Sequence, residues 1–189
     1  MTAQNGTLQI EYWSPSTPFL SKFEQEFDFE NKIELTKRYW WISIILSAIY
    51  LALVYYGVRY MKDRPAFDLR KPLAIWSGAL AVFSFLGALH VLPEGIYAVQ
   101  QGLHYFFCVK RSIVINRTLQ FWVYWFSVSK VIEFGDTFFI VMRKQKLSFL
   151  HYIHHAITLI FAFYTFGENG SLMRMGSTMN YSVHTLMYG

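Results

Sequence analysis

Cysteine, charge and proline are all scarce in this 189-residue chain. Cys108 is its only cysteine, which excludes an intramolecular disulfide and any metal or iron-sulfur site built from several cysteines. Charged residues make up 15% of the chain and hydrophobic residues 54%, a balance unlike that of an ordinary soluble domain. The sequence therefore predicts a protein that crosses a membrane several times.

The few charges lie in short clusters beside apolar runs. The net charge is +5, but bases that flank apolar segments are typical of membrane proteins, so we expect no nucleic-acid partner. Residues 1–38 are polar and acidic, with no apolar run behind a basic start. We therefore expect no cleavable signal peptide, and the first span is expected to act as the insertion signal.

The sequence divides into a polar region, 1–38, and an apolar region, 39–189. Asn5 begins a glycosylation sequon, Asn5-Gly6-Thr7. Between residues 19 and 35, apolar residues alternate with acids and lysines, which predicts a short amphipathic helix on the membrane surface. The alternative is a disordered acidic arm. We interpret 1–38 as a tail with an interfacial segment, and 39–189 as the transmembrane domain.

Long apolar runs predict an all-α, polytopic transmembrane fold with about five spans. The expected helices are 39–60, 72–91, 119–142, 147–166 and a last one from residue 172 that is cut off at Gly189. Pro93 and Glu94 are expected to close the second helix. Residues 95–118 mix apolar residues with a histidine and bases, and they receive no assignment.

Two short connectors, 62–71 and 143–146, are rich in bases. The antiparallel helices around them place both connectors at the same membrane face. Glycosylation of Asn5 would require a luminal N-terminus, and both connectors would then be cytosolic.

Polar residues interrupt the predicted span 119–142. Lys130, Glu133, Asp136 and Thr137 follow the spacing i, i+3, i+6, i+7, which places a cation and two carboxylates on one helix face. Ionisable groups inside a bilayer are costly and are commonly functional. The alternative is structural, in which these charges neutralise one another and hold helices together.

Three of the six histidines lie within five residues of one another. The spacing of His151, His154 and His155 is i, i+3, i+4, which predicts that their imidazoles point into a common space. On the last helix, Asn180 and His184 form an i, i+4 pair. Polar groups on either side of the connector 143–146 lie at similar depth, at about 1.5 Å per residue. We therefore expect the three polar faces to line one cytosol-facing cavity.

Two chemistries suit such a cavity. A membrane di-iron oxygenase, such as a lipid desaturase or hydroxylase, needs several histidine boxes, and this chain has one box and the single His184, so we expect no metal. Without a metal, imidazole acts as nucleophile and base, carboxylates fix its tautomer, and a cation stabilises developing negative charge. Lys130, Glu133 and Asp136 suit these supporting roles.

Three motifs resemble the fatty acid elongases of the endoplasmic reticulum. Lys130-Val-Ile-Glu133-Phe-Gly-Asp136-Thr137 is similar to their K-x-x-E-x-x-D-T, and His151-Tyr-Ile-His154-His155 is similar to their H-x-x-H-H box. Asn180-Tyr-Ser-Val-His184-Thr-Leu-Met187-Tyr188 resembles their N-x-x-x-H-x-x-M-Y segment. The resemblance covers nearly the whole chain. His151 at the first box position and Arg143-Lys144-Gln145-Lys146-Leu147 resemble the branch that extends long-chain saturated and monounsaturated acyl groups.

The resemblance implies a seven-helix fold in which six helices form a barrel around a narrow acyl tunnel, and this chain would contain the first five. It also implies a very-long-chain 3-oxoacyl-CoA synthase, which condenses acyl-CoA with malonyl-CoA and needs no cofactor. His154 would attack the acyl thioester, and His184 would assist the second step. His151 and His155 would position groups or exchange protons. Supporting and substrate-binding roles would fall to Lys130, Glu133, Asp136, Thr137 and Asn180.

The same resemblance implies an endoplasmic reticulum location and, as partners, the reductases and dehydratase of the elongation cycle. A homo-oligomer is left open. Family sequences continue beyond Tyr188, so the alternative to an active enzyme is a truncated form that is inactive or that modulates intact elongase subunits.

Overall fold

The computed structural model describes residues 3–4, 7–8, 21–108, 117–168 and 171–188. Apart from the antiparallel pair β1 (Ala3–Gln4) and β2 (Thr7–Leu8), the regular elements in these ranges are helices. The predicted all-α fold is confirmed. Asn5, the predicted sequon asparagine, lies outside the described residues, so its glycosylation stays a prediction.

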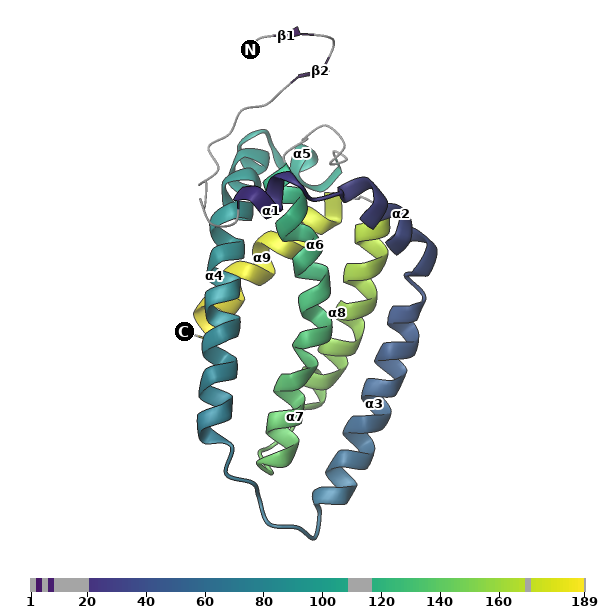
Figure 1. Ribbon diagram of the computed structural model, residues 1–189, viewed down its shortest axis with the longest axis vertical. Helices are drawn as coiled ribbons and strands as arrows, with labels where there is room; N and C mark the ends of the chain where they lie inside the picture. The colour runs from purple at the N-terminus through teal and green to yellow at the C-terminus, as the bar shows by residue number, and fades with distance from the viewer. Residues whose placement is uncertain (1–2, 5–6, 9–20, 109–116, 169–170, 189) are drawn as a thin grey trace.

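Two short helices lie across one end of the molecule (Figure 1). They are α1 (Ser21–Gln25) and α2 (Phe29–Tyr39). The sequence predicted a single helix here, but Asp28 caps α2 by accepting a 3.2 Å hydrogen bond from the amide of Asn31, which starts a new helix. The crosswise placement agrees with a segment that lies on a membrane surface.

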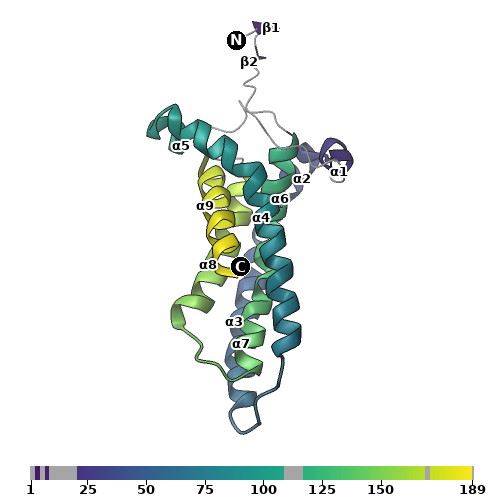
Figure 2. The ribbon, with the colours of Figure 1, turned by 90° about the vertical axis from the view of Figure 1, so that its left-hand side faces the viewer.

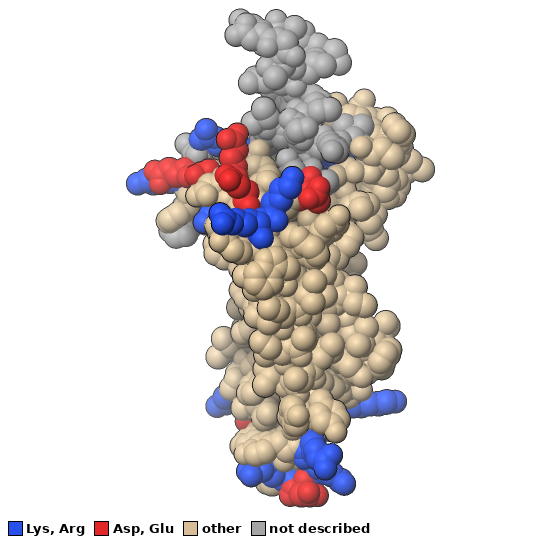
Figure 3. Space-filling model, turned by 90° about the vertical axis from the view of Figure 1, so that its right-hand side faces the viewer, with Lys and Arg blue, Asp and Glu red and all other residues tan. Residues whose placement is uncertain are grey.

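Three helices in the described part of the chain are long and apolar enough to cross a membrane: α3 (Ile42–Met61), α4 (Arg70–Gln100) and α8 (Phe149–Gly167). A further crossing is split into α6 (Arg117–Ile132) and α7 (Phe134–Met142), while α9 (Ser171–Tyr188) packs against α4. Charged side chains gather at the two ends, with an almost uncharged belt between them (Figure 3). The protein is thus a membrane-embedded helical protein.

The prediction that Pro93 closes the second span is wrong. Helix α4 contains Pro93 and continues to Gln100, and its upper part leans toward α5 (Leu103–Cys108) (Figure 2). Proline removes one helical hydrogen bond, at a cost of about 3 kcal/mol in an ordinary helix. The residues that follow are buried, because Glu94 pairs with Arg174 of α9 and Ala98 is fully enclosed. Tertiary packing therefore outweighs the local signal.

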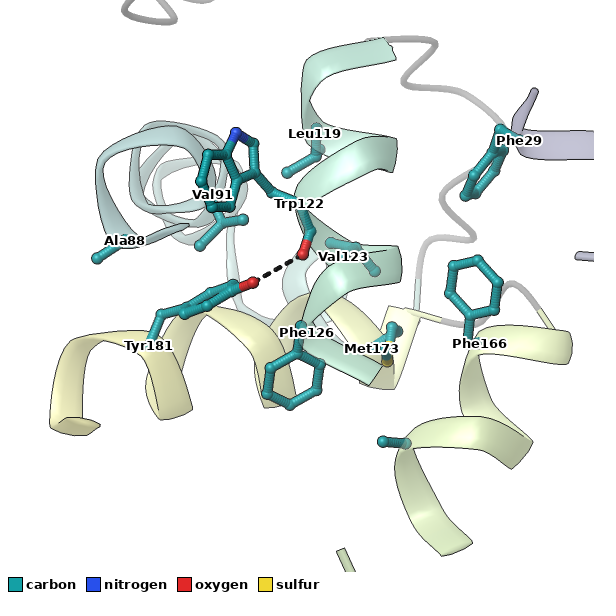
Figure 4. Packing of buried hydrophobic residues seen from close by; sticks show 11 residues of the cluster. Phe29, Ala88, Val91, Leu119, Trp122, Val123, Phe126, Phe166, Met173 and Tyr181 are labelled. Carbon is teal, nitrogen blue, oxygen red and sulfur yellow. Dashed lines mark hydrogen bonds between the residues drawn. The ribbon is translucent and has the colours of Figure 1, made fainter. Parts of the chain in front are cut away.

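Helices α4 and α9 approach each other closely at small residues. A Cβ at Gly95 would lie 2.7 Å from Cγ2 of Thr178, and one at Gly87 would meet the ring of Tyr181. Such close backbone approach at glycine is typical of membrane helix pairs. The Tyr181 hydroxyl in turn donates to the Trp122 carbonyl of α6 at 2.8 Å (Figure 4). This contact places α9 in the middle of the main apolar core, beside α4 and α6.

The two basic connectors meet at the end of the molecule opposite α1 and α2 (Figure 1). Lys144 adopts a left-handed backbone conformation with φ of 53°, and its Nζ donates to the carbonyls of Lys62 and Arg64 at 3.0 Å. The amide of Phe67 donates to the Met142 carbonyl at 3.0 Å. The prediction that both connectors share one face is confirmed.

Candidate active site

The crossing formed by α6 and α7 is interrupted at Glu133. The Glu133 amide still donates to the Ser129 carbonyl at 2.8 Å, whereas the Asp136 amide donates to the Glu133 carbonyl at 3.0 Å, one residue short of α-helical spacing. A tightened step of this 3₁₀ type within a helix often marks a functional position. It falls among the polar residues that the sequence singled out.

Glu133 is the centre of the polar cluster, and only 4% of it is exposed. Its Oε1 accepts hydrogen bonds from Lys130 Nζ at 2.5 Å and from Ser129 Oγ at 3.0 Å. The same oxygen lies 3.7 Å from His184 Nδ1, and Oε2 lies 3.9 Å from His155 Nδ1. Side chains from α6, α8 and α9 thus converge on one carboxylate.

Lys130 extends this cluster to α9. Its Nζ also donates to Asn180 Oδ1 at 2.8 Å, and Asn180 Nδ2 lies 3.3 Å from His184 Nε2. A buried ammonium is tolerated when a carboxylate and further hydrogen bonds satisfy it. The pair formed by Lys130 and Glu133 therefore neutralises itself while it holds an amide and two imidazoles nearby.

The three histidines of α8 have different surroundings. His155 is buried beside Glu133, His151 is half-buried with Nε2 3.1 Å from Thr137 Oγ1, and His154 is exposed. At about 100° per residue, His155 lies about 40° around the helix from His151, whereas His154 lies about 60° away in the other direction. The predicted common space is therefore reached by His151 and His155, and His154 borders it from the exposed side.

Ring contacts nevertheless join the three histidines into one row. The ring centroids of His151 and His155 are 4.6 Å apart, and those of His154 and His155 are 5.9 Å apart. The Nδ1 atom of His155 is buried and has no hydrogen-bond partner among the described residues. A buried polar atom without a partner calls for an explanation, and a catalytic role is one.

Asp136 and Thr137 connect α7 to α4 and α3. Asp136 accepts a 2.7 Å hydrogen bond from Trp76 Nε1 and another from the Tyr188 hydroxyl. The hydroxyls of Thr137 and Tyr50 are 2.6 Å apart. All the predicted catalytic and supporting residues of α6 to α9 thus belong to one neighbourhood, with His154 at its edge.

Sequence reasoning missed Tyr50 and Trp76 as members of this neighbourhood. Tyr50 has a signal in the sequence, because Ser43, Ser47 and Tyr50 at i, i+4 and i+7 form a polar stripe on an otherwise apolar helix. All three are buried, and Ser47 Oγ donates to the Ala156 carbonyl at 3.0 Å. Trp76 has no comparable signal, because tryptophan is common in membrane helices for other reasons.

Two cavities lie beside α3. One, of about 720 Å³, is lined by Tyr50, Phe134 and Thr137 among other residues of α3 and α7. The other, of about 930 Å³, lies at the connector end, where Arg59 and Lys144 join its apolar lining. Both volumes fall in the range of about 300–1,000 Å³ that ligand pockets occupy. Apolar space therefore adjoins the polar cluster.

A metal centre has no obvious place among these residues. Within the described ranges, no group of three or more histidine, cysteine, aspartate or glutamate side chains is arranged to hold a metal ion. His155 and His184 direct Nδ1 toward the Glu133 carboxylate instead. This arrangement suits imidazoles that are oriented by a carboxylate for acid, base or nucleophilic work. The predicted lack of a metal stays a prediction.

Comparison with known proteins decides the family. A family described as ELO: GNS1/SUR4 family matches residues 35–189. The chain belongs to the GNS1/SUR4 family. All three motifs lie inside the matched residues, so the resemblance inferred from them is confirmed. The GNS1/SUR4 match covers α3 to α9 and the last five residues of α2.

Relatives within the GNS1/SUR4 family carry consistent names. The chain is 40% identical over 168 residues to "Very long chain fatty acid elongase 6" of Gallus gallus, covering 88% of this chain and 63% of that protein. It is 38% identical over 176 residues to the Drosophila melanogaster protein of the same name, covering 93% and 56%. It is 38% identical over 170 residues to "Very long chain fatty acid elongase 3" of Homo sapiens, covering 87% and 62%. The chain thus spans about three fifths of the length of these relatives.

Proposed function

We propose that this chain carries the condensing site of fatty acid elongation, which joins a long-chain acyl-CoA with malonyl-CoA to give 3-oxoacyl-CoA, CoA and carbon dioxide. The observation that supports it most is the convergence of three motif segments, from α6 and α7, from α8 and from α9, on the Glu133 carboxylate. The names of the relatives support the same activity.

In the first step, His154 is the nucleophile. A ring nitrogen attacks the thioester carbon, a C–N bond forms, the C–S bond breaks, and the leaving CoA thiolate takes the proton that the imidazole loses. His154 is the exposed histidine of the box, so a large CoA thioester can reach it. Its ring contacts the ring of His155, whose Nδ1 lies 3.9 Å from Glu133 Oε2.

In the second step, malonyl-CoA loses carbon dioxide and its carbanion attacks the acyl carbon. A C–C bond forms, the C–N bond breaks, and the imidazolide of His154 takes up a proton from water to regenerate the neutral ring. His184 would assist in this step, because Glu133 and Asn180 hold its ring in place beside the polar cluster. Lys130 supplies the positive charge in the same cluster.

The bases at the connector end support a cytosolic entry for the substrates. Lys62, Arg64 and Lys144 lie together there, where they can attract the phosphates of CoA. In this orientation the N-terminus would lie in the lumen of the endoplasmic reticulum, and the product would pass to the reductases and dehydratase of the elongation cycle.

The test is incubation of microsomes that contain the chain with radiolabelled palmitoyl-CoA and malonyl-CoA. We expect 3-oxoacyl products that are two carbons longer and labelled acyl-protein when malonyl-CoA is omitted. His154→Ala should remove both signals, and labelled acyl-protein that persists in this variant would refute His154 as the nucleophile.

Because the chain spans about three fifths of its relatives, the same assay is run on a chimera that adds the C-terminal part of the Gallus gallus relative. Activity of the chimera alone would favour the truncated, modulatory form proposed as the alternative. Stoichiometric iron and a requirement for oxygen would favour the desaturase or hydroxylase instead.

A further inference from the structure

The Thr137 hydroxyl lies between two groups that come from different helices. Its Oγ1 is 2.6 Å from the Tyr50 hydroxyl of α3 and 3.1 Å from His151 Nε2 of α8. Thr137 and Tyr50 are almost fully buried, with 1% and 5% exposed. The three polar groups therefore form one row of hydrogen bonds that runs from the first span to the histidine box.

The numbers of donors and acceptors limit where the protons of these three hydrogen-bonded groups can lie. Each hydroxyl has one proton to donate, and a neutral imidazole has one nitrogen that donates and one that accepts. If Tyr50 donates to Thr137 and Thr137 donates to His151 Nε2, both buried hydroxyl protons are used. If His151 Nε2 donates instead, one hydroxyl proton has no acceptor among the three groups, which is costly for a buried group. The Thr137 proton needs Nε2 as its acceptor in any case, and a hydrogen bond donated by Tyr50 polarises the Thr137 hydroxyl and strengthens its bond to Nε2.

We propose that Tyr50 is a positioning residue that acts through Thr137 to hold His151 as the neutral tautomer with its proton on Nδ1. The consequence for catalysis rests on the proposed function, whereas the tautomer itself does not. With Nε2 occupied as an acceptor, His151 carries its ring proton on Nδ1, and the centroid of the His155 ring lies 4.6 Å from its own.

Tyr50 is well held for this task. Its ring stacks on Phe134 of α7 with centroids 3.9 Å apart and an interplanar angle of 10°. One turn earlier, Ser47 Oγ donates to the Ala156 carbonyl of α8 at 3.0 Å. The first span is therefore fixed against both helices that supply Thr137 and His151, so the position of the hydroxyl is set by packing.

The test uses Tyr50→Phe, which keeps the stacked ring and removes the hydroxyl, with Tyr55→Phe on the exposed face of α3 as the matched control. The readout is ¹⁵N NMR of histidine-labelled full chain in lipid nanodiscs, with the His151 signals assigned through His151→Gln. We expect wild type and Tyr55→Phe to show a protonated Nδ1 and an unprotonated Nε2. In Tyr50→Phe we expect a minor fraction of the Nε2-protonated tautomer to appear, because Thr137 donates more weakly without the bond from Tyr50.

A protonated Nε2 in the wild type, or an unchanged tautomer in Tyr50→Phe, would overturn the proposal. Thr137→Val, which keeps the side-chain shape and removes the donor to Nε2, should mix the two tautomers more strongly than Tyr50→Phe, and an unchanged His151 tautomer in this variant would also refute the proposal. In a preparation that condenses substrates, kcat of both variants should fall in proportion to the lost fraction of the Nδ1-protonated tautomer, with KM unchanged. A preparation with no turnover but the expected tautomer would count against the proposed function alone.

Discussion

Two buried ion pairs in this molecule are built from similar residues but have different surroundings. Near the N-terminal helices, Arg174 Nε donates to Glu94 Oε1 at 2.6 Å, and its Nη1 donates to the carbonyls of Tyr105 and Phe106 at 3.3 Å. In the middle of the bundle, Lys130 pairs with Glu133 at 2.5 Å. Both pairs are between 1% and 4% exposed, so burial does not distinguish them.

The surroundings of the two carboxylates do distinguish them. Arg174 also donates to backbone carbonyls of α5, so its pair with Glu94 joins α4, α5 and α9. Glu133 instead has two imidazole nitrogens at 3.7 and 3.9 Å, beyond hydrogen-bond distance. Hydrogen bonds no longer than 3.3 Å hold the pair of Arg174 and Glu94, whereas the two longer contacts of Glu133 leave room for protons to move. Geometry, rather than residue type, therefore separates the structural pair from the one that we propose to take part in catalysis.

Loss of the structural pair should have the largest effect. Arg174→Met leaves Glu94 buried without its cation, which should lower the free energy of unfolding by about 3–5 kcal/mol. The measurement is equilibrium unfolding in detergent micelles. The double variant Arg174→Met with Glu94→Leu should recover much of the loss, because both charges are then gone. A single variant as stable as the wild type would show that the pair does not hold these helices.

Loss of a histidine beside Glu133 should affect rate rather than stability. His184→Gln should lower the rate of condensation by at least about 100-fold, as expected for an acid–base group, while the free energy of unfolding changes by less than about 1 kcal/mol. The assay compares product formation and melting temperature in the same preparation. A large drop in melting temperature with full activity in the folded fraction would make His184 structural.

The contact between α4 and α9 gives a smaller and more local test. Gly95→Ala places a Cβ 2.7 Å from Thr178 Cγ2, and such overpacking should cost about 1–3 kcal/mol of unfolding free energy. Gly78→Ala is the matched control in the same helix, since nothing lies within 4 Å of its Cβ. Alanine there should stabilise the helix by about 0.5–1 kcal/mol. Equal effects of the two substitutions would contradict the close packing.

Much of the site could be predicted because helical spacing and short connectors determine it. The connector 143–146 forces α7 and α8 to lie antiparallel, so residues equally far from it meet, as Thr137 and His151 do. The exposure of His154 and the membership of Tyr50 and Trp76 depend on how helices rotate against one another. The prediction that Pro93 closes the second span failed for the same reason, because packing against α9 keeps the residues after Pro93 helical.

The bridge from Lys144 to the end of α3 sets an order of events during synthesis. Lys144 lies 82 residues after Lys62, whose carbonyl it binds. At about 5–20 residues per second, the ammonium follows that carbonyl out of the ribosome after roughly 4 to 16 seconds. Until then, water and lipid headgroups must satisfy the last carbonyls of α3, which is feasible only at the membrane surface. The first span can therefore insert alone, and the connector after the third crossing, formed by α6 and α7, later fixes its end.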